Sequence, residues 1–146
     1  MEKVALFCYG TLQSPMVMKA VTGRAYTGSE AVLQNWARFR VRDSEYAGIV
    51  QRPDSLVIGK LYCNLDAQAM AKLDDFEGEK YERVRVRVTC PDGAVEDAYT
   101  YAIRDDFRDL LSDDPWDFDK FIQNGLERFI HWFVEDRRYF FDRGDL

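Results

Sequence analysis

The chain has 146 residues, of which 47% are hydrophobic and 14% aromatic, enough apolar surface for one folded domain rather than a disordered chain. Its net charge of −6 disfavours a nucleic-acid partner, because proteins bind phosphates through clustered Lys and Arg. No apolar run approaches the roughly 18 residues of a membrane-spanning helix, and a strand-like run follows Met1-Glu2-Lys3 directly, so we expect a cytoplasmic protein with no signal peptide and no membrane partner.

The first part of the chain predicts a strand, a tight loop and a helix. Lys3 to Cys8 is a short continuous apolar run, which is typical of a buried strand. Tyr9-Gly10-Thr11-Leu12 follows as a tight loop. Pro15 suits the first turn of a short helix, which Gly23 ends. From Arg24 to Val41 we expect two strands or one bent strand.

The middle of the chain predicts a loop, a strand and a second helix. A glycine, a proline and several charges within Arg42 to Ser55 indicate a connecting loop, with a short extended piece at residues 49–50. Val57 to Cys63 is predicted to be a strand. Asp66 suits the N-cap of a helix that ends near Phe76.

A β-hairpin and a long helix are predicted in the last part. Tyr81 to Cys90 and Ala94 to Ile103 flank Pro91-Asp92-Gly93, which suits a tight turn. A polar connection then leads to Pro115, which opens the longest helical candidate. Its apolar residues recur at helical spacing and predict a core-facing stripe of Phe118, Phe121, Ile122, Leu126, Phe129 and Phe133. We expect the tail, residues 135–146, to dock on the domain.

The candidate for proton transfer is Glu77, which lies where the second helix runs into the strand beginning at Tyr81. A carboxylate held between a helix and a sheet suits acid-base chemistry. On its own, the same sequence also describes a solvated helix end capped by Gly78. Asp74 and Asp75 are neighbouring carboxylates that could pair with Glu77 or face water.

The loop Tyr9-Gly10-Thr11-Leu12 is the second candidate. Its glycine allows a sharp bend that presents backbone N–H groups to an anionic ligand. Alone it is an ordinary turn, but together with the motif from Leu73 to Gly78 it becomes informative. At this combination the sequence resembles the γ-glutamylcyclotransferase-like superfamily, particularly the small members that include γ-glutamylamine cyclotransferases. The resemblance covers residues 3–104 and also rests on Val57 to Tyr62 and Ala98 to Tyr101.

The resemblance implies a small mixed, largely antiparallel β-barrel with packed helices. Together with the long C-terminal helix that the apolar spacing predicts, this gives a single α+β domain over residues 1–146. The resemblance also implies the following site residues: Glu77 as the catalytic group, Tyr9, Gly10, Thr11 and Leu12 as the loop that holds the glutamyl end, and Tyr81 and Tyr101 as further substrate contacts. The substrate's α-amine would attack its own γ-carbonyl to give 5-oxoproline and a free amine. This chemistry requires neither a metal nor another cofactor.

Other interpretations remain open at the level of sequence. The pocket could belong to a non-catalytic binding module for a small anionic metabolite. The aromatic C-terminal helix matches nothing equally specific and could be a cover or a homodimer surface. The three cysteines are odd in number and widely spaced, which predicts neither a disulfide framework nor a zinc site. A nucleophilic pair of Cys8 and His131 is conceivable, but nothing in the sequence brings the two together.

Overall fold

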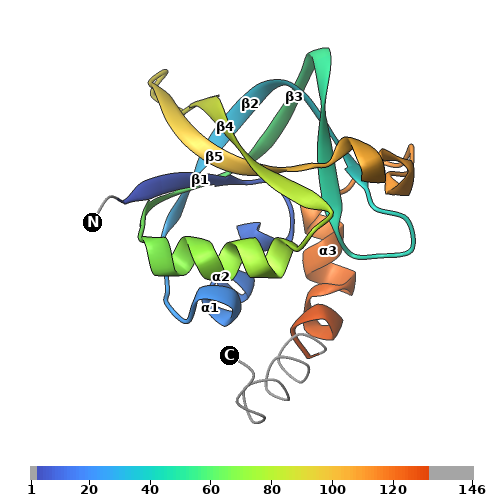
Figure 1. Cartoon of the computed structure of the whole chain (residues 1–146), viewed down its shortest axis with the longest axis horizontal. Helices are drawn as coiled ribbons and strands as arrows, with labels where there is room; N and C mark the ends of the chain where they lie inside the picture. The colour runs from blue at the N-terminus through green and yellow to red at the C-terminus, as the bar shows by residue number, and fades with distance from the viewer. Residues whose placement is uncertain (1–2, 132–146) are drawn as a thin grey trace.

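β1 closes a barrel by pairing with strands on both of its sides. The computed structural model describes residues 3–131, and its strands are β1 (Val4–Cys8), β2 (Gly28–Arg40), β3 (Ala47–Leu65), β4 (Tyr81–Thr89) and β5 (Val95–Ile103). Their order around the barrel is β1-β3-β2-β4-β5 (Figure 1). Neighbouring strands run antiparallel except β1 and β5, which are parallel with Leu6 opposite Tyr99. The prediction of a mixed, largely antiparallel barrel is confirmed.

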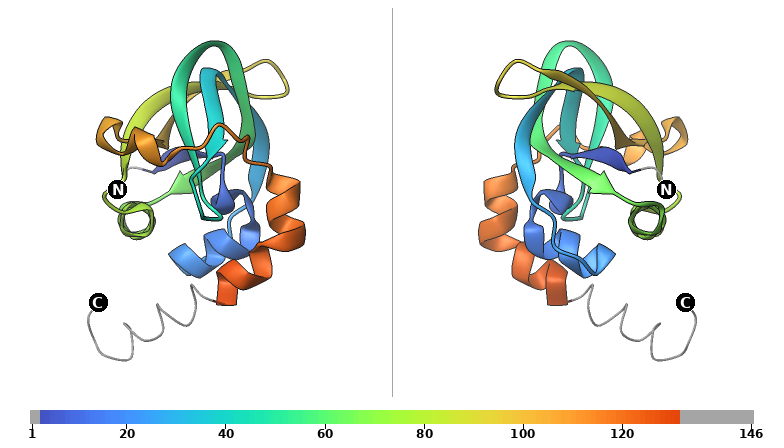
Figure 2. Two further views of the ribbon diagram at one scale, coloured as in Figure 1. Left: turned by 90° about the vertical axis from the view of Figure 1, so that its right-hand side faces the viewer. Right: turned by 90° about the vertical axis from the view of Figure 1, so that its left-hand side faces the viewer.

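The three α-helices gather at one end of this barrel, as the views in Figures 1 and 2 agree. The helical elements are η1 (Thr11–Gln13), α1 (Pro15–Thr22), α2 (Ala67–Glu77), η2 (Asp105–Leu110) and α3 (Phe118–Asn124). The predicted cap of α2 is confirmed, since the Asp66 side chain accepts a hydrogen bond from the Ala69 N–H at 2.8 Å. Gly78, at φ 76°, ends α2 directly after Glu77. No helix among residues 3–131 is both long and apolar enough to cross a membrane.

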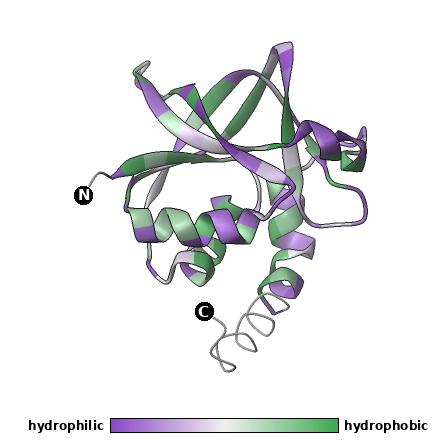
Figure 3. Ribbon diagram, viewed as in Figure 1, coloured by the Kyte–Doolittle hydropathy of each residue, from purple (hydrophilic) through white to green (hydrophobic). Residues whose placement is uncertain are grey.

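The core follows the strand periodicities that the sequence predicts. β1 is hydrophobic along most of its length (Figure 3), and Leu6, Phe7 and Cys8 are buried. In β4 the side chains alternate, with buried or half-buried valines between exposed arginines. The predicted hairpin between β4 and β5 is also confirmed, because Gly93 takes φ 88° and the Cys90 N–H donates to the Ala94 carbonyl at 2.8 Å.

The loop predicted for Arg42 to Ser55 is wrong over most of its length. β3 begins at Ala47 and runs through both the short extended piece and the predicted strand. Gln34 lies opposite Leu56 and Trp36 lies opposite Gln51, so residues 52–55 bulge out across from Asn35. The proline of this region lies within the bulge, where it interrupts no ladder hydrogen bond. Within the stretch from Arg24 to Val41, where two strands or one bent strand were expected, Gly28–Arg40 forms the single strand β2.

The C-terminal helix begins later than predicted and is interrupted. Asp117 caps α3 by accepting a hydrogen bond from the Lys120 N–H, so the helix begins three residues after Pro115. A turn at Gly125 separates α3 from a further helical stretch at residues 126–131. Phe121 and Phe129 are buried as expected, whereas Ile122 is 40% exposed. The predicted positions of Phe133 and of the tail at residues 135–146 lie outside the described residues.

Candidate functional site

A small cavity lies where the end of β1, the end of α2 and the turn between β2 and β3 meet. Its volume is about 20 Å³, which is room for roughly one water molecule. It is lined by Phe7, Cys8, Tyr9, Gly10, Thr11, Leu12, Tyr46, Ala47, Glu77 and Tyr101. As it stands, the cavity therefore encloses little more than one water molecule.

The loop that follows β1 is held by the half-buried guanidinium of Arg38. Arg38 donates through one guanidinium nitrogen to the Tyr9 carbonyl at 2.8 Å, and the Gln13 side-chain amide donates to the same oxygen at 2.9 Å. A trans peptide points its C=O and N–H in opposite directions. Anchoring the Tyr9 carbonyl on Arg38 therefore directs the N–H of Gly10, a cavity residue, away from Arg38.

The second half of the loop is fixed from the same side. The Lys60 ammonium donates to the Gln13 carbonyl at 2.9 Å. The Tyr62 hydroxyl lies 3.1 Å from the Leu12 carbonyl and 3.2 Å from that of Gln13. Because these carbonyls are occupied, the loop is rigid, and the first N–H groups of a helical turn are the ones that an anion can use.

Glu77 is the last residue of α2, and its carboxyl lines the cavity although the residue as a whole is half-buried. Removal of the carboxyl from water raises the pKa of Glu77 from 4.5 to about 8, and the nearby Asp74 carboxylate adds to the shift. A group with a pKa near neutrality can both accept and return a proton, which suits acid-base catalysis.

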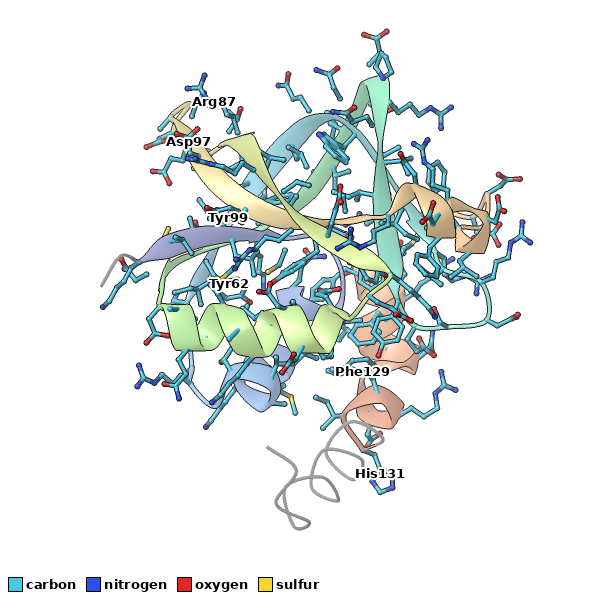
Figure 4. The ribbon with its side chains drawn as sticks, in the orientation of Figure 1. Tyr62, Arg87, Asp97, Tyr99, Phe129 and His131 are labelled. Carbon is cyan, nitrogen blue, oxygen red and sulfur yellow. The ribbon has the colours of Figure 1, made fainter. Side chains whose placement is uncertain are left out.

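Asp74 belongs to a small network at the edge of the cavity. It accepts a hydrogen bond from the Tyr101 hydroxyl at 2.7 Å and lies 3.6 Å from the guanidinium of Arg83. Arg83 of β4 in turn stacks over the ring of Tyr99 of β5 at 5.1 Å, and Tyr99 is labelled in Figure 4. Asp74 is thus held one helical turn before Glu77, on the same face of α2.

Tyrosine hydroxyls surround Glu77 from several elements. Burial raises the pKa of Tyr46 to about 12, and the charge of Glu77 contributes to this shift. The pKa values of Tyr9, Tyr81 and Tyr101 are raised too, first by burial and then in part by Glu77. All of these hydroxyls therefore remain protonated around neutral pH, and those of Tyr9, Tyr81 and Tyr101 donate hydrogen bonds to protein oxygens.

Comparison with known proteins connects this geometry to a family. Residues 6–118 match the family described as "Gamma-glutamyl cyclotransferase, AIG2-like". The chain belongs to this family. AIG2-like protein C of Arabidopsis thaliana is 32% identical over 139 residues, which are 91% of this chain and 79% of that relative. AIG2-like protein D of the same organism is 29% identical over 130 residues, which are 86% of this chain and 84% of that relative.

Solved structures share the fold of this AIG2-like chain. A solution structure of an Arabidopsis thaliana protein matches with a TM-score of 0.70 at 25% identity, covering 95% of this chain and 84% of that one. A structure of a gamma-glutamyl cyclotransferase matches with a TM-score of 0.63 at 20% identity, covering 70% of this chain and 68% of that one. The resemblance inferred from the sequence is confirmed at the level of the superfamily.

The structure brings most of the predicted site residues together. Tyr9, Gly10, Thr11, Leu12, Tyr101 and Glu77 all line the one cavity. Tyr81 is not among the lining residues. Its hydroxyl donates to the Ala47 carbonyl at 2.8 Å, so it anchors the start of β3 beside the cavity.

The sequence alone did not identify Phe7, Tyr46 and Ala47 as cavity residues. It suggested Cys8 only as half of a conceivable nucleophilic pair with His131. Tyr46 and Ala47 fall in the segment predicted to be a loop, and no local motif pairs them with Glu77. Burial and the charge of Glu77 raise the pKa of Cys8 well above its usual range, which keeps the thiol neutral. His131 is exposed at the end of the described helix (Figure 4) and does not line the cavity, so the structure does not unite it with Cys8 in one site.

Proposed function

We propose that this chain is a γ-glutamyl cyclotransferase that converts a γ-glutamyl-amine or a γ-glutamyl-amino acid into 5-oxoproline and a free amine. The observation that carries the proposal is the shared cavity. Glu77 and the loop from Tyr9 to Leu12, which are far apart in the sequence, line the same space. Membership in the AIG2-like family supports the reaction class.

Glu77 moves the protons of the proposed reaction. As a carboxylate it accepts a proton from the substrate's α-amine while that nitrogen forms a bond to the γ-carbon. As a carboxylic acid it returns the proton to the leaving nitrogen when the original γ-amide bond breaks. One amide replaces another and the protons balance, so the cycle consumes no water. The pKa of about 8 supports this exchange, since both forms of Glu77 are accessible near neutral pH.

The loop from Tyr9 to Leu12 binds the substrate's α-carboxylate through backbone N–H groups. Anchoring that end holds the flexible glutamyl chain near its cyclising conformation, with the α-amine close to the γ-carbonyl. Such preorganisation of the intramolecular attack removes much of the entropic part of the activation free energy of cyclisation. Arg38 and Lys60 support the binding indirectly, because they fix the loop carbonyls on the opposite side.

A panel of γ-glutamyl compounds tests the proposal. The purified protein is expected to release 5-oxoproline from at least one γ-glutamyl-amine or γ-glutamyl-amino acid. Glu77→Gln keeps the size of the side chain but cannot exchange a proton, so turnover should fall at least about a thousandfold while the thermal unfolding transition is retained. Full turnover by a folded Glu77→Gln variant would remove Glu77 from the mechanism.

A non-catalytic binding module for a small anionic metabolite would use the same cavity and predicts a different result. Such a protein would show saturable stabilisation by a γ-glutamyl compound with no product. Measuring heat stability and product in the same samples separates the two functions, since only the enzyme converts the compound that stabilises it.

A further inference from the structure

We propose that Tyr46 is a second catalytic residue, whose hydroxyl donates a hydrogen bond to the γ-carbonyl oxygen of the substrate and to the oxyanion that forms there. The inference rests on the proposed cyclotransferase function and adds a group to it. In that function Glu77 moves the protons and the Tyr9–Leu12 loop binds the α-carboxylate. Negative charge also develops on the γ-oxygen when the amine attacks, and stabilising it requires a further donor.

The cavity presents one acceptor and one donor that no other part of the protein uses. Glu77 and Tyr46 line it together. Within residues 3–131, no hydrogen bond or ion pair involves the Glu77 carboxyl or the Tyr46 hydroxyl. Polar groups that are removed from water are normally paired, so these two indicate a ligand that supplies a partner for each. An amide supplies both through its nitrogen and its carbonyl oxygen.

The other side-chain donors of the lining are less suited to the γ-oxygen. The Tyr9 hydroxyl donates to the Tyr101 carbonyl, and the Tyr101 hydroxyl donates to a carboxylate of α2 at 2.7 Å. Thr11 belongs to the loop that takes the α-carboxylate. The Cys8 thiol is a weak donor. Tyr46 is therefore the hydroxyl that remains for the γ-oxygen.

Neighbouring rings hold the Tyr46 side chain in place. Its ring meets that of Phe129 edge to face with centroids 5.6 Å apart, and it lies 6.4 Å from the ring of Phe76, the residue directly before Glu77. Edge-to-face contacts restrict the orientation of both rings. A donor that is positioned before the reaction needs little reorganisation when charge develops, which is what makes oxyanion stabilisation effective.

The backbone of the turn between β2 and β3 is fixed as well. The Val41 N–H donates to the Tyr46 carbonyl at 2.9 Å, and the Tyr46 N–H donates to the Ser44 hydroxyl at 3.1 Å. Trp116 donates through its indole N–H to the carbonyl of Glu45, the preceding residue, at 2.9 Å. These contacts position Tyr46 without using its hydroxyl, which stays available to a ligand.

The proposed reaction needs Glu77 and the oxyanion donor at different corners of one carbon. In the tetrahedral intermediate, the γ-carbon carries the attacking nitrogen, the leaving nitrogen, the oxyanion and a methylene carbon. Glu77 exchanges protons with the two nitrogens, so the oxyanion needs a donor from another element. Tyr46 comes from the turn between β2 and β3, whereas Glu77 ends α2. Burial raises the pKa of Tyr46 to about 12, so the hydroxyl keeps its proton and the proton balance of the reaction is unchanged.

The substitution Tyr46→Phe removes the hydroxyl and keeps the ring with its aromatic contacts. We expect kcat to fall about a hundredfold, as for the loss of one oxyanion donor, while KM changes less than about threefold. The thermal unfolding transition should be retained, because no hydrogen bond within residues 3–131 is lost. Tyr26→Phe is the matched control, since Tyr26 is half-buried against the core and does not line the cavity. It should leave kcat and KM unchanged.

A thioamide substrate tests which atom the Tyr46 hydroxyl contacts. The experiment uses the γ-glutamyl compound that the wild-type protein converts fastest and its analogue with sulfur in place of the γ-carbonyl oxygen. Sulfur accepts hydrogen bonds less well than oxygen. The ratio of kcat for the oxygen compound to kcat for the sulfur compound should therefore be about tenfold larger in the wild type than in Tyr46→Phe. Tyr26→Phe should keep the wild-type ratio.

Two results would overturn the inference while leaving the cyclotransferase function intact. One is full kcat in a folded Tyr46→Phe variant. The other is a raised KM with unchanged kcat and an unchanged ratio of oxygen to sulfur, which would place the hydroxyl at the α-carboxylate instead of the γ-oxygen. Absence of 5-oxoproline from every γ-glutamyl compound with the wild-type protein would instead overturn the proposed function itself.

Discussion

Asp74 lies one helical turn before Glu77 on α2. Burial raises the pKa of Glu77 to about 8, and the Asp74 carboxylate adds to this shift. The Asp74 carboxylate is held by the Tyr101 hydroxyl and by Arg83, so its position relative to the Glu77 carboxyl is fixed. Two carboxylates in distinct surroundings thus have distinct roles. Asp74 accepts the hydrogen bond of Tyr101 beside the cavity, and Glu77 is the carboxyl whose pKa is raised into the working pH range.

The rate should rise with pH as Glu77 loses its proton, and Asp74→Asn should move this rise to lower pH. The substitution removes the negative charge that disfavours the Glu77 carboxylate while keeping an oxygen for Tyr101. We expect a shift of the kcat/KM profile of about one pH unit toward acid.

Asp75→Asn is the control, because Asp75 is exposed on the same helix and has no part in the network. A profile that shifts equally in both variants would mean that general surface charge, rather than Asp74, sets the pKa of Glu77.

The stability of the protein should depend on pH through Glu77. Its pKa is about 8 in the folded chain against an ordinary 4.5, so the folded state binds more protons between these values. The free energy of unfolding therefore falls as pH rises from about 4.5 to 8 and remains reduced above it. Glu77→Gln should remove this fall and stabilise the protein at pH 9 by about 4–5 kcal/mol relative to its effect at pH 4.

Urea unfolding of the wild-type protein and of Glu77→Gln at pH 4 and pH 9 measures this change in the free energy of unfolding. All other titrating groups contribute equally to the two proteins. If the free energies of unfolding of wild type and variant differed by the same amount at pH 4 and pH 9, the pKa of Glu77 would not be raised in the folded protein.

Arg38→Met should weaken substrate binding without touching the substrate. The variant keeps the length and the apolar stem of the side chain but loses the hydrogen bond to the Tyr9 carbonyl. With the loop less firmly held, we expect KM to rise about tenfold, which corresponds to about 1.4 kcal/mol, with a smaller effect on kcat.

Arg87→Met is a matched control, since Arg87 is exposed and, within residues 3–131, pairs only with Asp97, at 3.4 Å near the tip of the β4–β5 hairpin (Figure 4). Steady-state kinetics that change equally in the two variants would contradict a specific role for Arg38.

Gly59→Ala should destabilise the fold next to the site. A β-carbon at Gly59 would collide with the Cys8 carbonyl and would lie 2.9 Å from the Phe7 ring. Both contacts belong to the end of β1, so the added methyl group must push β1 and β3 apart. We expect a loss of about 2–3 kcal/mol in the free energy of unfolding, measured with urea.

Gly10→Ala offers the contrast, because a β-carbon there would make an ordinary 3.5 Å contact with the Ala47 methyl group. A Gly59→Ala variant as stable as Gly10→Ala would contradict the close approach of β1 to β3.

The sequence correctly predicted those parts of the site whose structure depends on neighbouring residues in the chain. The cap at Asp66 and the glycine after Glu77 define α2, and the apolar run of β1 leads directly into the Tyr9–Leu12 loop. The meeting of these two segments followed from the family resemblance, since nothing in their spacing fixes a contact across the barrel.

Tyr46 could not be predicted, because its place depends on nonlocal contacts. Proline and charged residues made its surroundings resemble a loop, whereas pairing with β2 confines the irregularity to the bulge at residues 52–55. Its orientation comes from Phe129, more than eighty residues later. The break in the C-terminal helix has a similar cause, since Gly125 is where the Glu45 carboxylate lies against the backbone.

The most direct measurement of the central claim is the reaction in water enriched in oxygen-18, with products analysed by mass spectrometry. Attack by the substrate's own amine predicts unlabelled 5-oxoproline and free amine in equal amounts, and neither product from Glu77→Gln. Labelled glutamate in place of 5-oxoproline would mean that water is the nucleophile, and it would contradict the intramolecular reaction assigned to Glu77 and the Tyr9–Leu12 loop.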